Sequence, residues 1–159
     1  MSGSEELIRQ ARTGTEGGFP KSPRKATAVI ACIDSRIAPH QILGGEQGDY
    51  HIIRNGGGLV TDDALRSLMV SQFYGTTQII IMMHTDCAAM AYPTNAERAR
   101  LESELGKRIT FDMHPFDDLE TELRRGVRLL RETPLLPNRD RIKGVIYDVE
   151  TGRLRTVVE

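Results

Sequence analysis

Two short segments of the chain carry side chains that could hold a metal ion. The segment HTDC supplies His84 and Cys87 directly after the apolar run QIIIMM. The other cysteine of the chain, Cys32, ends a similar apolar run and is followed by Asp34 and Arg36. Two thiolates and one imidazole are suitable zinc ligands, and three protein ligands leave a fourth tetrahedral position for water, as in catalytic zinc sites. The question is whether the two segments meet.

Asp34 and Arg36 indicate what such a site could do. An aspartate two residues after a metal-bound cysteine can reach the open side of the metal, and the guanidinium of Arg36 can keep it ionised. Asp34 could then accept the proton of a zinc-bound hydroxide and direct the oxygen toward an electrophile. Alternatively, Asp34 could leave Arg36 and become the fourth metal ligand. A loop salt bridge without metal is the third interpretation, and an exposed one contributes little stability.

The residue types alone leave three interpretations of the cysteines open. Cys32 and Cys87 could bind metal together with His84, or they could form a redox-active disulfide pair. Each could also be a small apolar residue of the core.

Composition narrows the class of protein. The chain has 159 residues, and its 21 basic and 22 acidic side chains give a net charge of −1, with no bias toward nucleic acid. No apolar run approaches the roughly 18 residues of a membrane span, and no basic segment leads into an apolar one at the start of the chain. We therefore expect a cytoplasmic protein without nucleic acid or membrane partners, in a compartment where thiols stay reduced.

Apolar runs that alternate with amphipathic segments predict an α/β fold. The continuous runs at 26–33, 50–54 and 78–83 are typical of parallel strands covered on both faces. Thr61 is suited to begin a helix between the second and third strands. The apolar face expected for that helix consists of Leu65, Leu68, Met69 and Phe73. Ligands bind at the carboxyl ends of parallel strands, so Cys32 and His84 would converge if their strands are neighbours.

The remaining segments complete one domain. Helices are expected at 94–106 and 117–132, and a final hairpin is expected to turn at Gly152. A short N-terminal helix is expected at 4–13, where Ser2 and Glu5 fit a capping box.

We thus predict a single α/β domain with a central, mostly parallel β-sheet flanked by helices and one antiparallel edge strand near the C-terminus. Residues 1–25 would form the N-terminal helix and a linker arm, and residues 26–159 would form the α/β domain, which is a zinc-binding catalytic domain if the metal interpretation of the cysteines holds.

The two segments together resemble the zinc signature of the β-class carbonic anhydrases. CIDSR at 32–36 and HTDC at 84–87 carry the likeness, and GDYHIIRNGGGLV at 48–60 is similar to the glycine-containing segment between them. GVIYDVETGRLRTV at 144–157 resembles the closing strands of that family.

The resemblance implies roles for individual residues. Cys32, His84 and Cys87 would bind one Zn²⁺ per chain, and Asp34 and Arg36 would form a catalytic dyad. In a closed state, Asp34 would be the fourth ligand.

The resemblance also implies an activity and an assembly. The activity is reversible hydration of CO₂ to bicarbonate and a proton by a zinc-bound hydroxide that the Asp–Arg dyad orients. The assembly is a homodimer, or a larger assembly of dimers, in which the N-terminal helix extends to the partner subunit. One alternative is a hydrolase of carbon disulfide or carbonyl sulfide on the same fold. Another is a non-catalytic, carbonic-anhydrase-like zinc or redox dimer.

Two of the departures from the family pattern bear on the expected site. Ala88 stands where a glycine usually follows the second cysteine, and its methyl group could restrict the loop. Gly58 stands where asparagine is typical, so a hydrogen-bonding side chain is absent there. Both departures favour the non-catalytic alternative to some degree.

Several other polar and aromatic residues are expected to have structural or supporting roles. Asp86 is expected to cap its own loop or to orient a ligand. His51 is expected to have a core or edge role, whereas His40 could be a surface proton relay. Phe73 and Tyr74 are interpreted as packing residues at the end of their helix.

Overall fold

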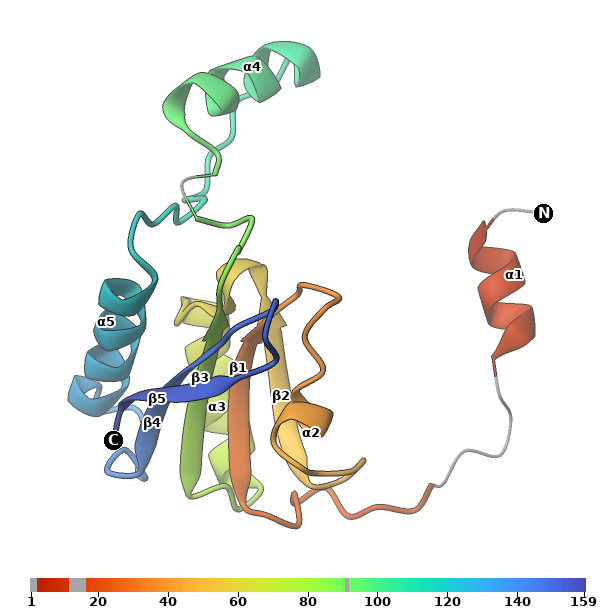
Figure 1. Ribbon diagram of the computed structural model, residues 1–159, viewed down its shortest axis with the longest axis vertical. Coiled ribbons are helices and arrows are strands. Elements are labelled where there is room, and N and C mark those ends of the chain that lie inside the picture. Colours follow the sequence, from red (N-terminus) through yellow and green to blue (C-terminus); the bar gives the residue numbers. More distant parts are fainter. Residues whose placement is uncertain (1–2, 12–16, 91) are drawn as a thin grey trace.

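A five-stranded sheet forms the centre of the computed structural model, which describes residues 3–11, 17–90 and 92–159 (Figure 1). Its strand order is β2-β1-β3-β4-β5. The strands are β1 (Thr27–Cys32), β2 (Tyr50–Asn55), β3 (Gln78–His84), β4 (Ile142–Tyr147) and β5 (Leu154–Val158). The first four are mutually parallel, and β5 runs antiparallel to β4. The predicted fold class is confirmed.

The burial of the strands explains their apolar sequences. All residues of β1 are buried, because β1 lies between β2 and β3 in the interior of the sheet. At the end of the sheet, Gly152 adopts φ of +69° in the turn between β4 and β5, as the predicted hairpin requires.

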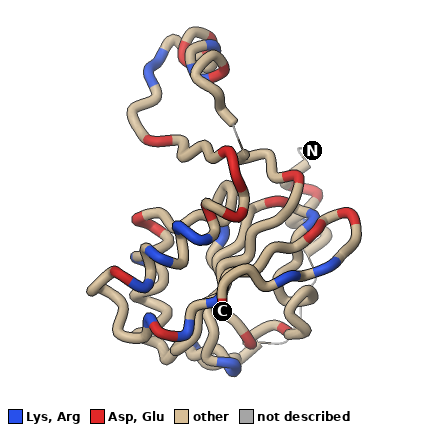
Figure 2. Tube along the Cα trace, turned by 60° about the vertical axis from the view of Figure 1, so that its left-hand side comes forward, with Lys and Arg blue, Asp and Glu red and all other residues tan. Residues whose placement is uncertain are grey.

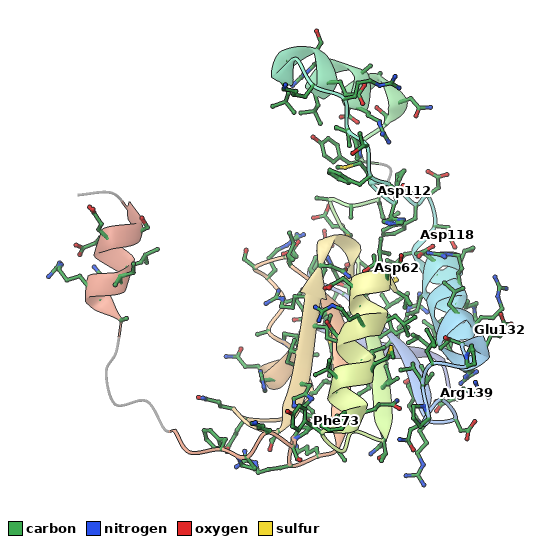
Figure 3. The ribbon with its side chains drawn as sticks, turned by 180° about the vertical axis from the view of Figure 1, so that it is seen from behind. Asp62, Phe73, Asp112, Asp118, Glu132 and Arg139 are labelled. Atoms are coloured by element: carbon green, nitrogen blue, oxygen red, sulfur yellow. The ribbon has the colours of Figure 1, made fainter. Side chains whose placement is uncertain are left out.

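Five α-helices are described: α1 (Gly3–Gln10), α2 (Pro39–Ile42), α3 (Asp62–Phe73), α4 (Asn95–Leu105) and α5 (Leu119–Glu132). A short 3-10 helix, η1, covers Gly56–Gly58. Figure 3 shows α3 and α5 side by side on one face of the sheet. The expected N-cap of α3 is confirmed, because the Thr61 hydroxyl accepts a hydrogen bond from the Ala64 amide at 3.2 Å.

The predicted apolar face of α3 is partly wrong. The helix buries Ala64, Leu68 and Ser71 against the sheet, whereas Met69 is 42% exposed and Phe73 is 83% exposed. The helix carries apolar residues around most of its circumference, so the 3.6-residue period could not select the buried side. Phe73 therefore is not a packing residue of this chain, although its ring makes an edge contact with Tyr74.

The helices α1 and α4 stand away from the sheet (Figure 1). Neither helix has a residue buried by the described part of the chain. The expected N-terminal helix is present at Gly3–Gln10, but Ser2 and residues 12–13 of the prediction lie outside the described residues. Within the described ranges, the helices are too short or too polar to cross a membrane.

Basic and acidic residues are interspersed along the chain, as the blue and red segments of the Cα tube show (Figure 2). This distribution agrees with the near-zero net charge of −1.

Candidate metal centre

The candidate site lies where the strand order reverses. From β1, the chain first adds β2 on one side and then β3 on the other, and both strands are parallel to β1. Such a switch point opens a crevice at the carboxyl ends of the strands. Cys32 is the last residue of β1 and His84 the last of β3, so the predicted convergence of the two segments is confirmed.

Three potential ligand atoms cluster at this point. The ligand atoms of Cys32, His84 and Cys87 all lie within 4.8 Å of one another. The two thiols are free, and their Sγ atoms are 3.9 Å apart. A tetrahedral zinc ion with Zn–S bonds of about 2.3 Å holds two sulfurs roughly 3.8 Å apart. The spacing therefore fits such an ion without rearrangement of the cysteines.

The ring of His84 is oriented as a metal ligand would be. Its Nδ1 lies 2.8 Å from the carbonyl oxygen of Thr85 and must donate to it, because a carbonyl only accepts. The lone pair is therefore on Nε2, which is buried and has no hydrogen-bond partner among the described residues. Burial also lowers the pKa of His84, which favours the neutral ring that binds metal. A bound cation would give the Nε2 atom a partner and so remove the free-energy cost of burying an unpaired polar atom.

The thiols occupy a buried environment. Burial raises the pKa of Cys87 to about 11, although the amides of Ala89 and Met90 oppose the shift. The amide of Gly57 donates to the Sγ of Cys32 at 3.3 Å. Without a metal, Cys87 stays protonated at neutral pH, so metal binding must release its proton.

Asp34 and Arg36 form a close pair beside this cluster. Arg36 donates from Nε to Oδ1 of Asp34 at 3.0 Å and from Nη2 to Oδ2 at 2.7 Å. These bonds, with one from the Arg36 amide, hold the pKa of Asp34 well below its usual range. Oδ2 of Asp34 is also 3.9 Å from Nε2 of His84. The carboxylate thus faces Arg36 while bordering the ligand cluster.

Arg54 is a residue that the sequence interpretation missed. Its Nε donates to the carbonyl of Cys32 at 2.8 Å, and its Nη2 donates to the carbonyl of Asp34 at 2.7 Å. Arg54 lies near the end of β2, next to β1 in the sheet. The sequence did contain one indication of this role, because Arg54 is a basic residue near the carboxyl end of a predicted strand.

The site opens into a cleft of about 790 Å³. Its lining consists of Cys32, Ile33, Asp34, Ser35, Arg36, Gly56, Gly57, Ala88, Ala89, Tyr92 and Met113. Positive φ angles at described non-glycine residues occur at Ala26, Asp86 and His114, and not at Ala88. The methyl group of Ala88 therefore requires no unusual backbone conformation.

Gly58 has a steric reason to lack a side chain. Its φ is +67°, and a Cβ there would lie 3.0 Å from the amide nitrogen of Cys32 and 3.2 Å from the carbonyl oxygen of Met82. The backbone at Gly58 thus packs directly on β1 and β3, beneath the ligand cluster.

Two other histidines, His51 and His40, differ from His84. His51 has both ring nitrogens in contact, one with the Lys21 carbonyl and one with the Ser71 hydroxyl, each at 2.8 Å. This agrees with its expected structural role. His40 has a buried Nε2 without a hydrogen-bond partner in the described part of the chain, so it does not present this nitrogen as a surface proton relay would.

Comparisons with known proteins identify the family. The sequence matches the carbonic anhydrase family over residues 27–154. It is 34% identical to β-carbonic anhydrase 1 of Mycobacterium tuberculosis over 146 residues, which cover 91% of this chain and 90% of the relative. The chain belongs to the β-carbonic anhydrase family.

This β-carbonic anhydrase family member is also similar to a carbonic anhydrase of known structure and to a carbon disulfide hydrolase. The crystal structure of carbonic anhydrase from Streptococcus mutans superposes with a TM-score of 0.90 at 40% identity, and the match covers 99% of this chain and 98% of that one. A carbon disulfide hydrolase of Acidithiobacillus thiooxidans is 35% identical over 160 residues, 87% of this chain and 79% of the relative.

Proposed function

We propose that this β-carbonic anhydrase family member is a zinc-dependent enzyme that reversibly hydrates CO₂ to bicarbonate and a proton. The observation that carries the proposal is the buried Nε2 of His84, which has no hydrogen-bond partner among the described residues and lies beside two free thiols. Buried polar atoms seldom lack a partner, and at His84 the free nitrogen lies within 4.8 Å of two further ligand atoms. Membership of the family supports the same conclusion.

Cys32, His84 and Cys87 would hold one zinc ion per chain. When bound, zinc supplies a Lewis acid that lowers the pKa of a water molecule toward about 7. Of the three residues, Cys32 lines the cleft together with Asp34 and Arg36, and the ligand atoms of His84 and Cys87 lie within 4.8 Å of its Sγ, so a metal held there would be close to a substrate in the cleft. Ile33, Ala88 and Ala89 give its lining apolar surface suited to a neutral, linear molecule.

Asp34 would orient the attacking water. Arg36 keeps the Asp34 carboxylate ionised, so it can accept a hydrogen bond but cannot donate one. Accepting a hydrogen bond from the attacking water would direct an oxygen lone pair toward the carbon of CO₂. Since Oδ2 of Asp34 is 3.9 Å from Nε2 of His84, a rotation of Asp34 away from Arg36 would also let it close the metal position.

Substitution of Asp34 by asparagine tests this role, because the side chains have the same shape. We expect Asp34→Asn to retain about one zinc per chain and to lose activity by about 10²-fold, the lower range for general acid–base groups. Stopped-flow CO₂ hydration between pH 7 and 9 and metal analysis would measure both. The matched control is Asp112→Asn, an exposed aspartate paired with His114. Wild-type protein that carries zinc but does not hydrate CO₂ would rule the proposal out.

A second candidate activity is hydrolysis of carbon disulfide or carbonyl sulfide. The relationship to a carbon disulfide hydrolase at 35% identity favours it. Both substrates are linear and apolar, and the cleft has room for either. Release of sulfide on addition of each substrate, measured beside CO₂ hydration, would distinguish the activities.

A homodimer, or an assembly of dimers, is also proposed. Leu7 and Ile8 of α1 are 70% and 76% exposed, and Phe73 of α3 is 83% exposed. A second copy that received α1 would remove these side chains from water. Sedimentation velocity should give a particle of at least twice the 17.7 kDa chain, and Leu7→Glu with Ile8→Glu should weaken it. A monomer at micromolar concentration would contradict this arrangement.

The division of the chain and its location follow from the same proposal. Residues 1–25 would act as the arm and residues 26–159 as the catalytic domain. The free thiols of the centre suit a reducing compartment, so we propose the cytoplasm.

A further inference from the structure

One guanidinium links the two loops that carry the proposed metal ligands. Arg36 donates from Nη1 to the Oδ2 of Asp86 at 2.7 Å and from Nη2 to the Asp86 carbonyl at 2.9 Å. The same side chain makes two bonds to the Asp34 carboxylate. Asp34 lies after Cys32 at the end of β1, and Asp86 lies between the two ligands of the HTDC segment. Arg36 therefore joins the loop after β1 to the loop after β3.

The bonds to Asp86 fix the direction of the guanidinium. The group is planar and presents its donors in a rigid fork, so contacts on two sides leave little freedom to rotate. Arg36 is 44% exposed, and the pair with Asp34 alone would leave its Nη1 edge in solvent. Asp86 supplies the second point of attachment.

The backbone of Asp86 is suited to this contact. Its φ is +51°, a left-handed conformation that aspartate and asparagine adopt more readily than most side chains. In this conformation both its carbonyl and its carboxylate accept bonds from Arg36. A residue needed only for the turn could be glycine, since the carboxylate plays no part in the turn.

The expected loop-capping role of Asp86 does not account for these contacts. Within the described ranges, the hydrogen bond of its carboxylate goes to Arg36, which is 50 residues away in the sequence. The carboxylate is 77% exposed, so solvent could satisfy it without any partner. Its long-range pairing is therefore a feature of the site and not of the turn.

We propose that Asp86 is a positioning residue that fixes Arg36 and, through Arg36, keeps the Asp34 carboxylate directed at the substrate water. This inference rests on the proposed function, in which Asp34 orients that water. It also assigns Asp86 a second effect, because the Arg36 bridge restrains the two ligand-bearing loops relative to each other. Loss of the bridge should therefore speed the release of bound zinc.

The test compares Asp86→Gly and Asp86→Asn with the wild-type zinc protein. Glycine accepts φ of +51° and removes the carboxylate, whereas asparagine keeps the shape and removes the charge. We expect kcat/KM for CO₂ hydration to fall about tenfold in Asp86→Gly and less in Asp86→Asn, as for loss of a charge-assisted bond. Transfer of zinc to a chelator should quicken several-fold in the same order.

The matched control is Asp63→Asn. Asp63 is similarly exposed, at 74%, and pairs with Arg66 at 2.8 Å on α3. It has the same chemistry as Asp86 but no contact with Arg36, so its substitution should leave both measurements within twofold of wild type.

A double-mutant cycle separates positioning from general support of the fold. If Asp86 acts through Arg36, the variant Arg36→Met with Asp86→Gly should match Arg36→Met alone, both in kcat/KM and in the rate of zinc transfer. Independent effects that multiply in the double variant would overturn the proposal. The proposal would also be overturned if kcat/KM and the rate of zinc transfer of Asp86→Gly stayed within twofold of wild type.

Failure of the proposed function gives a different result. If wild type binds zinc but does not hydrate CO₂, the proposed function is wrong, and so is the proposal that Asp86 positions Asp34 for the attacking water. The zinc-transfer cycle would still decide whether Asp86 acts through Arg36 on the two loops.

Discussion

His84 and His51 lie on parallel strands of one sheet but have opposite environments. His51 of β2 has both ring nitrogens within 2.8 Å of a polar partner. His84 of β3 has one nitrogen bonded and the other buried without a partner among the described residues, beside Cys32 and Cys87. The two residues are of the same type, but they differ in how many of their ring nitrogens have a hydrogen-bond partner. A histidine whose bonds are complete is structural, and one with an unsatisfied nitrogen has capacity left for a ligand.

An unsatisfied nitrogen alone does not make a metal centre. Nε2 of His40 is also buried and unpartnered in the described part of the chain. Among the described residues, however, the cluster of potential ligands contains Cys32, His84 and Cys87 and not His40. The centre therefore requires both the free nitrogen and converging ligands from a second strand.

The largest expected effect comes from removing the free nitrogen. We expect His84→Gln to reduce bound zinc to less than about 0.1 per chain and activity by about 10³-fold or more, since the metal supplies the nucleophile. Metal analysis and stopped-flow assays would measure this. His51→Gln is the matched control and should keep stoichiometric zinc. If His84→Gln kept its zinc, or if His51→Gln lost it, the assignment of His84 as the metal ligand and His51 as a structural residue would be wrong.

The second expected effect concerns the backbone beneath the centre. Gly58→Ala should lower the free energy of unfolding by about 2–4 kcal/mol, because a Cβ at φ of +67° would press on the backbone of β1 and β3. Gly106→Ala is the control: Gly106 has φ of +58°, but apart from its chain neighbours no described residue has an atom within 4 Å of the place where a Cβ would lie. It should cost only about 1 kcal/mol for the left-handed conformation. Urea unfolding would measure both, and equal losses would show that close packing at Gly58 is unimportant.

Local sequence patterns predicted the strands and the place of the centre. The runs that end in Cys32 and His84 are apolar because β1 and β3 are interior strands, and interior parallel strands carry their ligands at one edge. Periodicity could not orient α3, whose apolar residues cover most of the helix circumference. It also could not predict that Arg36 reaches Asp86 or that Arg54 reaches Cys32, because these bonds join residues 50 and 22 positions apart.

The third expected effect is a pH dependence of the metal-free protein. Burial raises the pKa of Cys87 to about 11 from an ordinary 9.0. A raised pKa in the folded state means that the stabilisation is complete below pH 9 and is lost as pH rises toward 11, because the unfolded thiol gives up its proton first. Metal-free wild type should therefore lose about 2 kcal/mol more than metal-free Cys87→Ser over this interval. Urea unfolding at several pH values would measure the difference, and parallel curves would contradict it.

The smallest expected effect tests the structural histidine. The Ser71 hydroxyl contacts His51 Nδ1 at 2.8 Å and the Thr76 hydroxyl at 2.9 Å, and Ser71 is only 3% exposed. Ser71→Ala should lower the free energy of unfolding by about 1–2 kcal/mol, because it leaves both partners with an unmet bond. Zinc content and CO₂ hydration should stay at wild-type values, since Nε2 of His51 still donates to the Lys21 carbonyl and no ligand of the centre is touched. A change in zinc content would mean that the two histidine environments are coupled through the sheet. If Ser71→Ala loses stability but keeps its zinc, the result would support a structural role for His51 and a metal-binding role for His84.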